Sequence, residues 1–356
     1  METKQPRPAS LPPQDTKSIA HVMVYLIYLG VVIPIKRLLG YKPPVPQWSI
    51  QEEISVCFLK YMTTATTESV RRIEDFVLGI ANAAVKVPRK PLDDAAGFRG
   101  LWYGDLTDAT ADATVLFIHG GGYSACSVHT HADAITTIQS MAKRHHGKSI
   151  RLLALAYSLA PEAQFPIQQN EALAAYTYLV RETTKPILLM GDSAGGNLVF
   201  SLLLALKKPE NQHLRAPAAA VLASPWCTLD TETLSESFTT HATTDYITVP
   251  KMYSCIHDFV GSASTKDPMV SPFYGDFTGS CPILLHYGGK ELFADDIELM
   301  AAKLKSQAVD VTLVKEPLAP HDTAFLKAFF GTMSTSASRV IAAYIASFAH
   351  SGAGAF

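Results

Sequence analysis

The chain of 356 residues lacks the sequence features of a disulfide-stabilised, metal-binding or heavily glycosylated protein. Its five cysteines lie far apart without a C-x-x-C pair, which predicts buried or free thiols. No N-x-S/T sequon occurs, which argues against heavy N-glycosylation. There is no H-E-x-x-H, and the neighbours His129/His131 and His145/His146 are interpreted as surface polar residues. The sequence therefore predicts neither a metal site nor a cofactor.

Charged residues are also scarce. Asp, Glu, Lys and Arg make up 17% of the chain and hydrophobic residues 48%, with a formal net charge of −2. Because there is no basic excess, nucleic acid is not an expected partner. The length fits one large α/β domain that carries a lid or an insertion, and the composition indicates an enzyme of small apolar or neutral substrates.

One hydrophobic run approaches the length of a membrane span. Residues 19–35 are apolar apart from His21 and two tyrosines, and Lys and Arg residues flank them. The run ends in Pro34-Ile35-Lys36-Arg37 without the small-residue site of a cleaved signal peptide. Two interpretations stay open, a membrane anchor or an apolar helix of a lid over the active site. The chain is accordingly expected to be membrane-associated or cytoplasmic.

The N-terminal third is expected to form an extension. Residues 1–17 are rich in proline and polar residues and are predicted to be disordered. The apolar helix is assigned to residues 18–40. Residues 41–95 are assigned to the lid, with a helix over 50–84 and a proline-rich boundary at 88–91.

Residues 96–350 are predicted to form the main α/β domain. Short apolar runs alternate there with helical patterns, which is typical of parallel strands buried on both faces. The pattern predicts a doubly wound, mostly parallel sheet whose functional residues lie beyond the carboxyl ends of its strands. A polar, Thr-rich excursion at about 227–267 is assigned to the lid. The predicted strands are 114–118, 151–156, 186–190, 218–223, 282–287 and 309–314.

Gly191-Asp192-Ser193-Ala194-Gly195-Gly196 lies between a predicted strand and an almost wholly apolar helix at 197–208. It fits G-x-S-x-G, in which small residues around the serine permit a sharp, strained turn that exposes the hydroxyl group. Strand, turn and helix are the arrangement that this motif requires. Ser193 is therefore predicted to be a nucleophile.

His119-Gly120-Gly121-Gly122-Tyr123 follows the strand 114–118. Glycines at a strand end expose N–H groups that can point at one anionic oxygen, as acyl transfer requires. Gly121, Gly122 and Ala194 are the predicted oxyanion donors, whereas His119, Gly120 and Asp192 are expected to brace the turns. A phosphate loop is excluded because G-K-[ST] is absent and the spacing does not match G-x-G-x-x-G.

These motifs resemble those of the hormone-sensitive lipase family of α/β-hydrolases, in the same order, over roughly residues 100–350. Ser158 stands where many relatives carry arginine, which is interpreted as a local structural change. The further motifs of the resemblance are Tyr157-Ser158-Leu159-Ala160-Pro161-Glu162, Ser224-Pro225-Trp226 and Asp267-Pro268-Met269-Val270-Ser271-Pro272.

A serine nucleophile needs a base and an acid, which follow it in the order acid, then histidine, in this fold. Of the late histidines, His286 lies inside a predicted strand and His350 in the final tail. His321 follows the last predicted strand, where the histidine of the family falls, and is the predicted base. The resemblance places Glu291 at the position of the acid, where relatives usually carry aspartate. Asp295 and Asp296 remain alternatives, although Asp295 is also suited to cap the next helix.

The resemblance implies a serine esterase that releases a short acyl group, such as acetyl, through an acyl-enzyme. It implies bulky apolar alcohols, such as sterols or specialised metabolites, as the other half of the substrate. Peptidase or amidase activity stays open. A tailoring enzyme that performs cyclisation or elimination also stays open. A ligand-binding protein is a further alternative, because the plant gibberellin receptor resembles this family. That receptor lacks the catalytic histidine, whereas His321 is present here.

Overall fold

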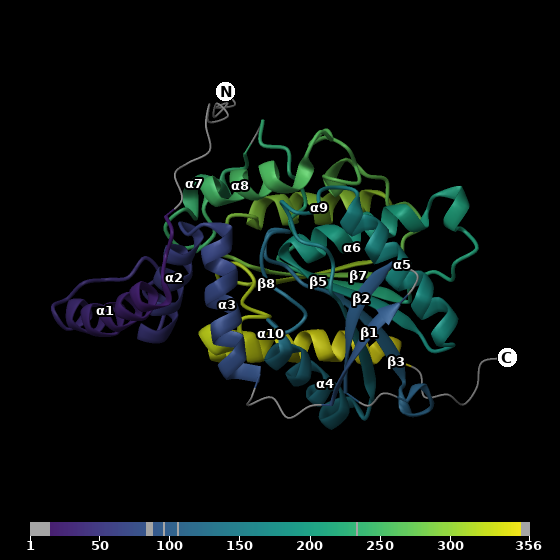
Figure 1. Ribbon diagram of the computed structural model, residues 1–356, viewed down its shortest axis with the longest axis horizontal. Coiled ribbons are helices and arrows are strands. Elements are labelled where there is room, and N and C mark those ends of the chain that lie inside the picture. Colours follow the sequence, from purple (N-terminus) through teal and green to yellow (C-terminus); the bar gives the residue numbers. More distant parts are fainter. Residues whose placement is uncertain (1–14, 83–87, 95–96, 105–106, 233, 350–356) are drawn as a thin grey trace.

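A sheet of eight strands, with helices on both faces, forms the centre of the computed structural model (Figure 1). The structure describes residues 15–82, 88–94, 97–104, 107–232 and 234–349. The strand order is β1-β2-β4-β3-β5-β6-β7-β8. β3 to β8 run parallel to one another, whereas β2 runs antiparallel to both of its neighbours, β1 and β4. The strands are β1 (Arg89–Asp94), β2 (Phe98–Tyr103), β3 (Ala113–Ile118), β4 (Ile150–Leu155), β5 (Ile187–Asp192), β6 (Ala219–Ala223), β7 (Ile283–Gly288) and β8 (Val311–Glu316).

Helices cover both faces of the sheet, which confirms the predicted doubly wound, mostly parallel α/β fold. The buried side chains of α4 (Ala132–His146) and α10 (Lys327–Phe348) form one core with one face of the strands. Those of α5 (Ile167–Glu182), α6 (Ser193–Leu206) and α9 (Ala294–Ser306) form a second core with the other face. The six apolar runs of the sequence correspond to β3 to β8.

The sheet begins earlier in the chain than the sequence predicted. β1 contains Arg89, Lys90 and Asp93, pairs with β2 alone and lies at the edge of the sheet. The predicted domain boundary at residue 96 therefore falls between two strands of one sheet. An edge strand with exposed polar residues shows no apolar run, which is why the sequence pattern missed it.

The N-terminal extension forms three helices, α1 (Ile19–Leu38), α2 (Ile50–Thr63) and α3 (Thr67–Asn82). The helix predicted over 50–84 is thus two helices that meet at residues 64–66. Residues 1–14 of the predicted disordered tail lie outside the described part of the chain, but residues 15–17 pack on this turn. The N–H of Asp15 donates to Thr64 O at 3.0 Å, and that of Lys17 donates to Ser69 Oγ at 3.0 Å.

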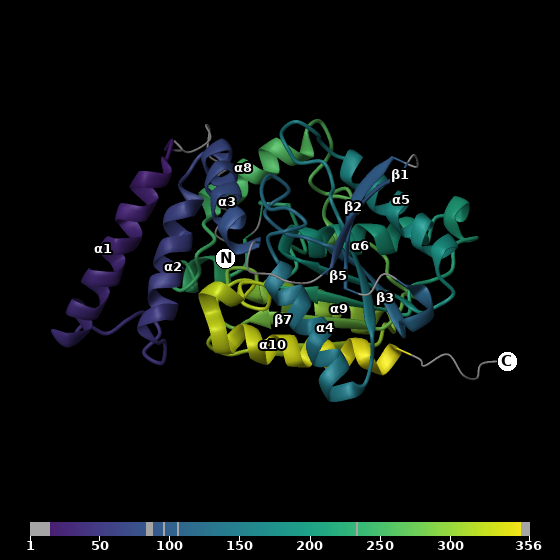
Figure 2. The same cartoon turned by 60° about the horizontal axis from the view of Figure 1, so that its bottom comes forward.

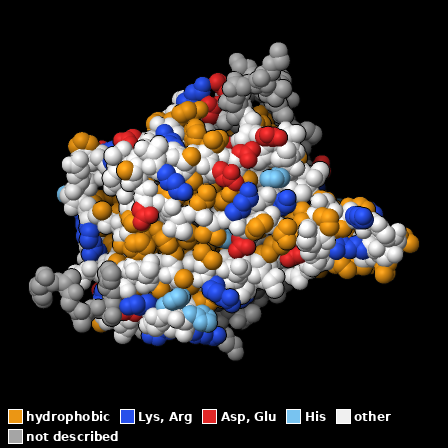
Figure 3. All heavy atoms as spheres, turned by 180° about the vertical axis from the view of Figure 1, so that it is seen from behind, with side chains coloured by type: hydrophobic (Ala, Val, Ile, Leu, Met, Phe, Trp, Pro, Cys, Tyr) orange, Lys and Arg blue, Asp and Glu red, His pale blue; other side chains and the backbone are white. Residues whose placement is uncertain are grey.

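α1 lies along α2 at the outer end of the molecule (Figure 2). It is long and apolar enough to cross a membrane, and only 17% of its most hydrophobic window is buried. The surface view shows its hydrophobic side chains on a projecting lobe (Figure 3). α1 buries Val22, Leu29 and Ile33 against the rest of the chain and leaves most of its other large apolar residues exposed.

The excursion predicted at 227–267 departs from the strand–helix alternation between β6 and β7. It contains the short helix α7 (Ser237–Thr240) and the longer α8 (Val249–Val260). Its buried side chains, among them Phe238, Met252 and Phe259, extend the core above the α6 face of the sheet.

Candidate active site

The turn from β5 into α6 holds Ser193 in a left-handed backbone conformation, with φ of 50°. The turn is tight enough that a Cβ on Gly191 would lie 2.6 Å from the carbonyl oxygen of Gly195. A Cβ on Gly195 would in turn collide with the carbonyl oxygen of Ile118. Glycine is therefore required on both sides, and the sharp elbow predicted from G-x-S-x-G is present.

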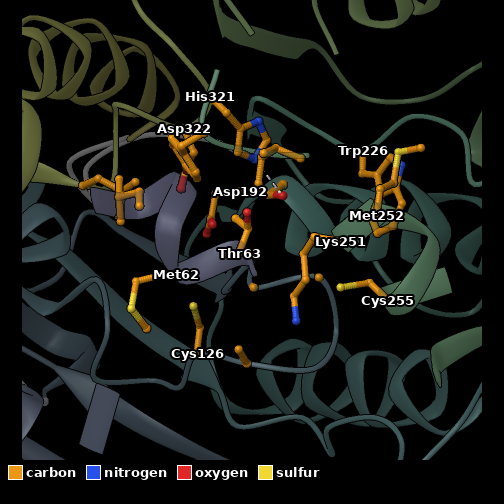
Figure 4. Close-up of a pocket in the computed structure, with 18 of the residues that line it drawn as sticks. Met62, Thr63, Cys126, Asp192, Trp226, Lys251, Met252, Cys255, His321 and Asp322 are labelled. Carbon is orange, nitrogen blue, oxygen red and sulfur yellow. Dashed lines mark hydrogen bonds between the residues drawn. The ribbon is translucent and has the colours of Figure 1, made fainter. Parts of the chain in front are cut away.

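The side chain of His321 lies against the serine of this elbow. The distance between His321 Nε2 and Ser193 Oγ is 2.9 Å, although 128 positions separate the two residues (Figure 4). His321 lies in the loop between β8 and α10, at the carboxyl end of the sheet. Burial lowers the pKa of His321 to about 3, so the imidazole is neutral and can accept a proton at physiological pH.

Glu291 is the acidic residue that the structure brings to His321. Its Oε2 lies 3.8 Å from His321 Nδ1 and accepts hydrogen bonds from Ser224 Oγ at 2.6 Å and from the N–H of Gly288 at 3.1 Å. Neither His321 Nδ1 nor Glu291 Oε1 has a hydrogen-bond partner within the described chain. A small rotation of either side chain would join them, and such bonds are often long before substrate binds.

Burial is the main cause that raises the pKa of Glu291 well above its usual range. The negative charge of Asp245 raises it further, whereas the hydrogen bonds from Ser224 and Gly288 oppose the increase. The fully buried carboxyl group is thus expensive to ionise unless a positive charge develops beside it. The imidazolium that forms when His321 takes a proton is such a charge.

The two alternative acids have other partners. Asp295 Oδ2 accepts from the N–H of Ser237 at 2.7 Å, and Asp296 pairs with the hydroxyl group of Ser235. The residue before α9 is Phe293, so Asp295 lies in the first turn of that helix and is not its N-cap. Of the other late histidines, His286 is buried in β7 and lies 3.6 Å from Glu316, and His350 lies outside the described residues.

The loop after β3 presents the glycines predicted as oxyanion donors. Gly121 and Gly122 have φ of 93° and 61°, a region that side chains disfavour. Within the part of the chain that the structure describes, their N–H groups donate no hydrogen bond. Both residues and Ser193 line one pocket, and Ala194 directly follows Ser193 at the start of α6. The N–H groups of the loop are thus available to a bound oxygen atom.

His119, Gly120 and Asp192, which the sequence analysis assigned to bracing, make hydrogen bonds in and around this loop. The N–H of Gly120 donates to Asp192 Oδ2 at 3.0 Å. The hydroxyl group of Tyr157 donates to the carbonyl oxygens of His119 and Gly120 at 2.9 and 3.0 Å. Burial lowers the pKa of His119 to about 4, and its ring stacks on Tyr157.

His131 is not the surface residue that the sequence suggested. It is buried at the start of α4, with Nε2 3.4 Å from Asp192 Oδ2. Asp322, next to His321, is buried beside them, and one ligand atom from each residue lies within 4.8 Å of the others. These three residues have the donor types of a metal site. Asp192 already accepts the N–H of Gly120 and pairs with His131. The need to hold the glycine loop therefore explains why two of the three residues, Asp192 and His131, lie together.

Asp245 is a second buried residue that the sequence analysis missed. Its carboxylate accepts the N–H of Leu292 at 2.7 Å and that of His321 at 3.2 Å, and also those of Tyr246 and Ile247. It therefore joins the backbone of the acid loop to that of the histidine loop. Burial raises the pKa of Asp245 to about 6, against these hydrogen bonds.

Ser193 and His321 open into a largely apolar pocket of about 220 Å³. α2 contributes Leu59, Met62 and Thr63 to its wall, so the N-terminal extension forms part of the pocket, as a lid would. α8 contributes Lys251, Met252 and Cys255 from the predicted excursion. Figure 4 shows Met62, Thr63, Lys251, Met252 and Cys255 around the space in front of His321.

Comparison with known proteins agrees with this geometry. A family model described as alpha/beta hydrolase fold matches residues 115–325, more than half of the chain. The crystal structure of an esterase from the bacterial hormone-sensitive lipase family superposes with a TM-score of 0.73 and 29% identity, over 85% of this chain and 99% of that chain.

Two curated relatives have names that refer to acetyl esters. An acetyl-hydrolase of Streptomyces hygroscopicus is 30% identical over 206 residues, which cover 57% of this chain and 66% of that protein. Steryl acetyl hydrolase 1 of Saccharomyces cerevisiae is 24% identical over 241 residues, which cover 60% of this chain and 54% of that protein. The chain thus spans less than two thirds of the length of either relative.

Proposed function

Since the chain belongs to the hormone-sensitive-lipase-like α/β-hydrolases, a family of serine ester hydrolases, we propose that it releases a short acyl group from an apolar alcohol. Acetyl is the acyl group that the similarity to acetyl-hydrolases favours. We propose a sterol or another specialised metabolite as the alcohol, because the lining of the pocket is largely apolar. The observation that carries this proposal is the 2.9 Å contact between Ser193 Oγ and His321 Nε2 beside unpaired N–H groups.

The reaction follows from the arrangement of these groups. His321 Nε2 takes the proton of Ser193 as the oxygen attacks the ester carbonyl, and the N–H groups of Gly121, Gly122 and Ala194 bind the resulting oxyanion. The imidazolium then gives its proton to the leaving alcohol, and an acyl-enzyme remains. Water, deprotonated by His321, attacks this acyl group, after which the carboxylic acid leaves and the serine regains its proton. Glu291 orients the imidazole and stabilises its charged form.

Replacement of the serine tests the proposal directly. Ser193→Ala should abolish hydrolysis of p-nitrophenyl acetate and prevent labelling by a fluorophosphonate probe, while the melting temperature stays close to that of the parent. A series of p-nitrophenyl esters from acetyl to decanoyl should show the highest kcat/KM for the shortest chains. Turnover by the Ser193→Ala variant would contradict the assignment of the nucleophile, and a maximum at long chains would contradict the assignment of the acyl group.

We also propose that α1 associates the chain with a membrane. The support is a 20-residue helix with a mean hydropathy of 1.9 in its most hydrophobic window, little of which is buried. Lys36 is exposed in its last turn, where it can meet lipid headgroups. Cells that express the chain with and without residues 1–40 would be fractionated. Recovery of the full chain in the soluble fraction without detergent would leave only the lid-helix interpretation.

A further inference from the structure

Lys251 is the feature of the pocket that hydrolysis of a simple apolar ester does not explain. It belongs to α8, and its side chain extends from that helix into the pocket (Figure 4). Among the described residues that line the pocket it is the one lysine or arginine. A lysine that only covered apolar surface would direct its ammonium group to solvent. This one belongs to the wall that also contains Ser193 and His321.

The ammonium group of Lys251 has no counter-ion in the described parts of the chain, where it makes neither a hydrogen bond nor an ion pair. Lys60, the lysine of α2, differs from Lys251 in that its ammonium group is bonded. Lys60 Nζ donates to the carbonyl oxygens of Ala242 and Asp245. Asp192 and Asp322 also line the pocket, but they are buried with His131, and Asp192 is bonded to Gly120. Among the described residues, no carboxylate therefore lies within ion-pair distance of Lys251.

The helix strengthens this positive potential. Lys251 occupies the first turn of α8, where its N–H donates to the N-cap Thr248 Oγ1 at 3.4 Å. The amino end of a 12-residue helix carries a partial positive charge, which disfavours a cation and favours an anion. Lys251, Met252 and Cys255 of α8 line the pocket, so this positive potential acts at the same wall as the ammonium group of Lys251. An anionic group is the ligand that would satisfy both.

The charge acts close to the glycine loop. Lys251 lowers the pKa of the Cys255 thiol, although burial dominates and raises it. Cys255 packs on the loop, because a Cβ on Gly122 would lie 2.6 Å from its sulfur atom. The anionic group would therefore lie on the same side of the pocket as the proposed oxyanion donors, within the volume that a bound substrate fills.

We propose that Lys251 binds an anionic group on the alcohol half of the substrate, so that the preferred ester has an apolar body and one carboxylate or sulfonate-like group. This rests on the proposed function, because an acetyl group fills only a small part of a pocket of about 220 Å³ and leaves the remainder to the alcohol. An ion pair formed in an apolar pocket is screened less than one at the surface.

The test compares esters that differ only in charge. The substrates are 3- and 4-acetoxybenzoate, 4-acetoxybenzenesulfonate and the neutral isostere 4-acetoxybenzamide, all of which release acetate. Lys251→Met keeps the length of the side chain and removes its charge. It should lower kcat/KM for the anionic esters at least about 10-fold more than for the amide, as expected for loss of one charge-assisted hydrogen bond. Lys251→Arg should restore most of the preference, and Lys251→Glu should reverse it.

Lys60→Met is the matched control, because it removes a nearby positive charge that is already bonded to carbonyl oxygens. It should leave the ratio of the anionic to the neutral ester unchanged. If Lys251→Met lowers kcat/KM equally for the charged and the neutral esters, so that the ratio of the two values is unchanged, the inference is overturned. Acetate release by the parent would still support the proposed function. If the parent protein hydrolyses none of the acetates, p-nitrophenyl acetate included, the proposed function fails and this inference fails with it.

Discussion

We expect Glu291 to stabilise charge that appears only during the reaction. Its Oε2 already accepts from Ser224 and Gly288, and His321 Nδ1 lies 3.8 Å away. An amide at this position would offer N–H groups to Nδ1 and so stabilise the wrong tautomer of the imidazole. We therefore expect Glu291→Gln to lower kcat/KM for p-nitrophenyl acetate by about 10³-fold or more, mainly through kcat. Steady-state kinetics at pH 7.5 would measure this.

The alternative acids provide the controls for this prediction. Asp295→Asn removes an acceptor for the N–H of Ser237, and Asp296→Asn removes the partner of Ser235, but neither change reaches His321. Both variants should stay within about 10-fold of the parent in kcat, because no catalytic charge is lost. Glu291→Asp, which has the acid common among relatives, should be more active than Glu291→Gln. Loss of turnover on Asp295→Asn, with activity kept in Glu291→Gln, would show that the acid is misassigned.

Asp245 should make stability depend on pH. Its pKa is raised from 3.8 to about 6 in the folded chain, so the folded protein takes up a proton between pH 7 and pH 5 that the unfolded protein does not yet bind. Proton uptake by the folded state stabilises it as the pH falls. Compared with Asp245→Asn, which cannot titrate, the parent should therefore gain about 1 kcal/mol of unfolding free energy from pH 7 to pH 5.

Urea unfolding of both proteins at the two pH values would measure this difference, because titration of the groups that do not interact with Asp245 cancels between them. Glu291 is the main exception, since the charge of Asp245 raises its pKa. A relative loss of stability by the parent on acidification would contradict the raised pKa. Asp245→Asn should also be less stable at both pH values, because an amide nitrogen cannot accept the N–H groups that the second carboxylate oxygen accepts.

At the residue scale the sequence predicted those groups whose roles follow from local pattern or family order. Ser193, Gly121, Gly122 and His321 stand in short motifs, and the structure brings all four to one pocket. His131 and Asp245 were missed because their roles come from contacts distant in sequence. Asp245 lies in a polar, Thr-rich stretch that resembles a surface loop, and its partner Leu292 is 47 positions away.

At the scale of elements, the glycine loop after β3 should tolerate no side chain at Gly121. This residue has φ of 93°, and an added Cβ would lie 2.7 Å from the carbonyl carbon of Ala125. The loop would have to move, and its N–H groups would no longer converge on the oxyanion. Gly121→Ala should therefore lower kcat by about 10²–10³-fold, as for loss of an oxyanion donor.

Gly147→Ala is the matched control for this loop. Gly147 ends α4 with φ of 70°, so alanine is strained there too, but nothing lies within 4 Å of the added Cβ. It should cost about 1 kcal/mol of stability and leave kcat unchanged. Thermal unfolding and kinetics on both variants separate strain from catalysis. Equal kcat losses in the two would mean that backbone strain alone explains the effect.

The sheet shows which elements sequence patterns can find. β3 to β7 are buried on both faces, and the edge strand β8 has half-buried Val311, Leu313 and Val314, so their apolar runs predicted them to within a few residues. β1 was missed because an edge strand needs no apolar run, and α2 and α3 were merged because both are helical and only three residues separate them. At the break, residues 64–66 pair with Asp15 from a distant part of the chain, a contact that no local pattern shows.

At the scale of the whole molecule, the packing of α1 restricts how it can meet a membrane. Arg37 Nε donates to Glu53 Oε2 at 2.7 Å, and Tyr25 stacks on Tyr61, so α1 is held along α2. α2 is itself bonded to the α/β domain through Ser55 Oγ, which donates to Phe329 O at 2.9 Å. If α1 crossed the bilayer in this arrangement, the charged residues of α2 would enter hydrocarbon at a cost of about 3 kcal/mol each. An orientation parallel to the membrane surface avoids this cost.

The exposed face of α1 should therefore bind vesicles without spanning them. Val24 and Ile27 are 66% and 65% exposed and lie on one face of the helix. The double variant Val24→Asp/Ile27→Asp should no longer sediment with anionic liposomes, whereas the parent sediments and is released by alkaline carbonate. Leu299→Asp, at a 54% exposed leucine of α9, is the control that adds a charge elsewhere and should keep binding. Retention of the parent after carbonate treatment would instead mean that α1 leaves α2 and spans the bilayer, and equal binding by the double variant would remove α1 as the contact.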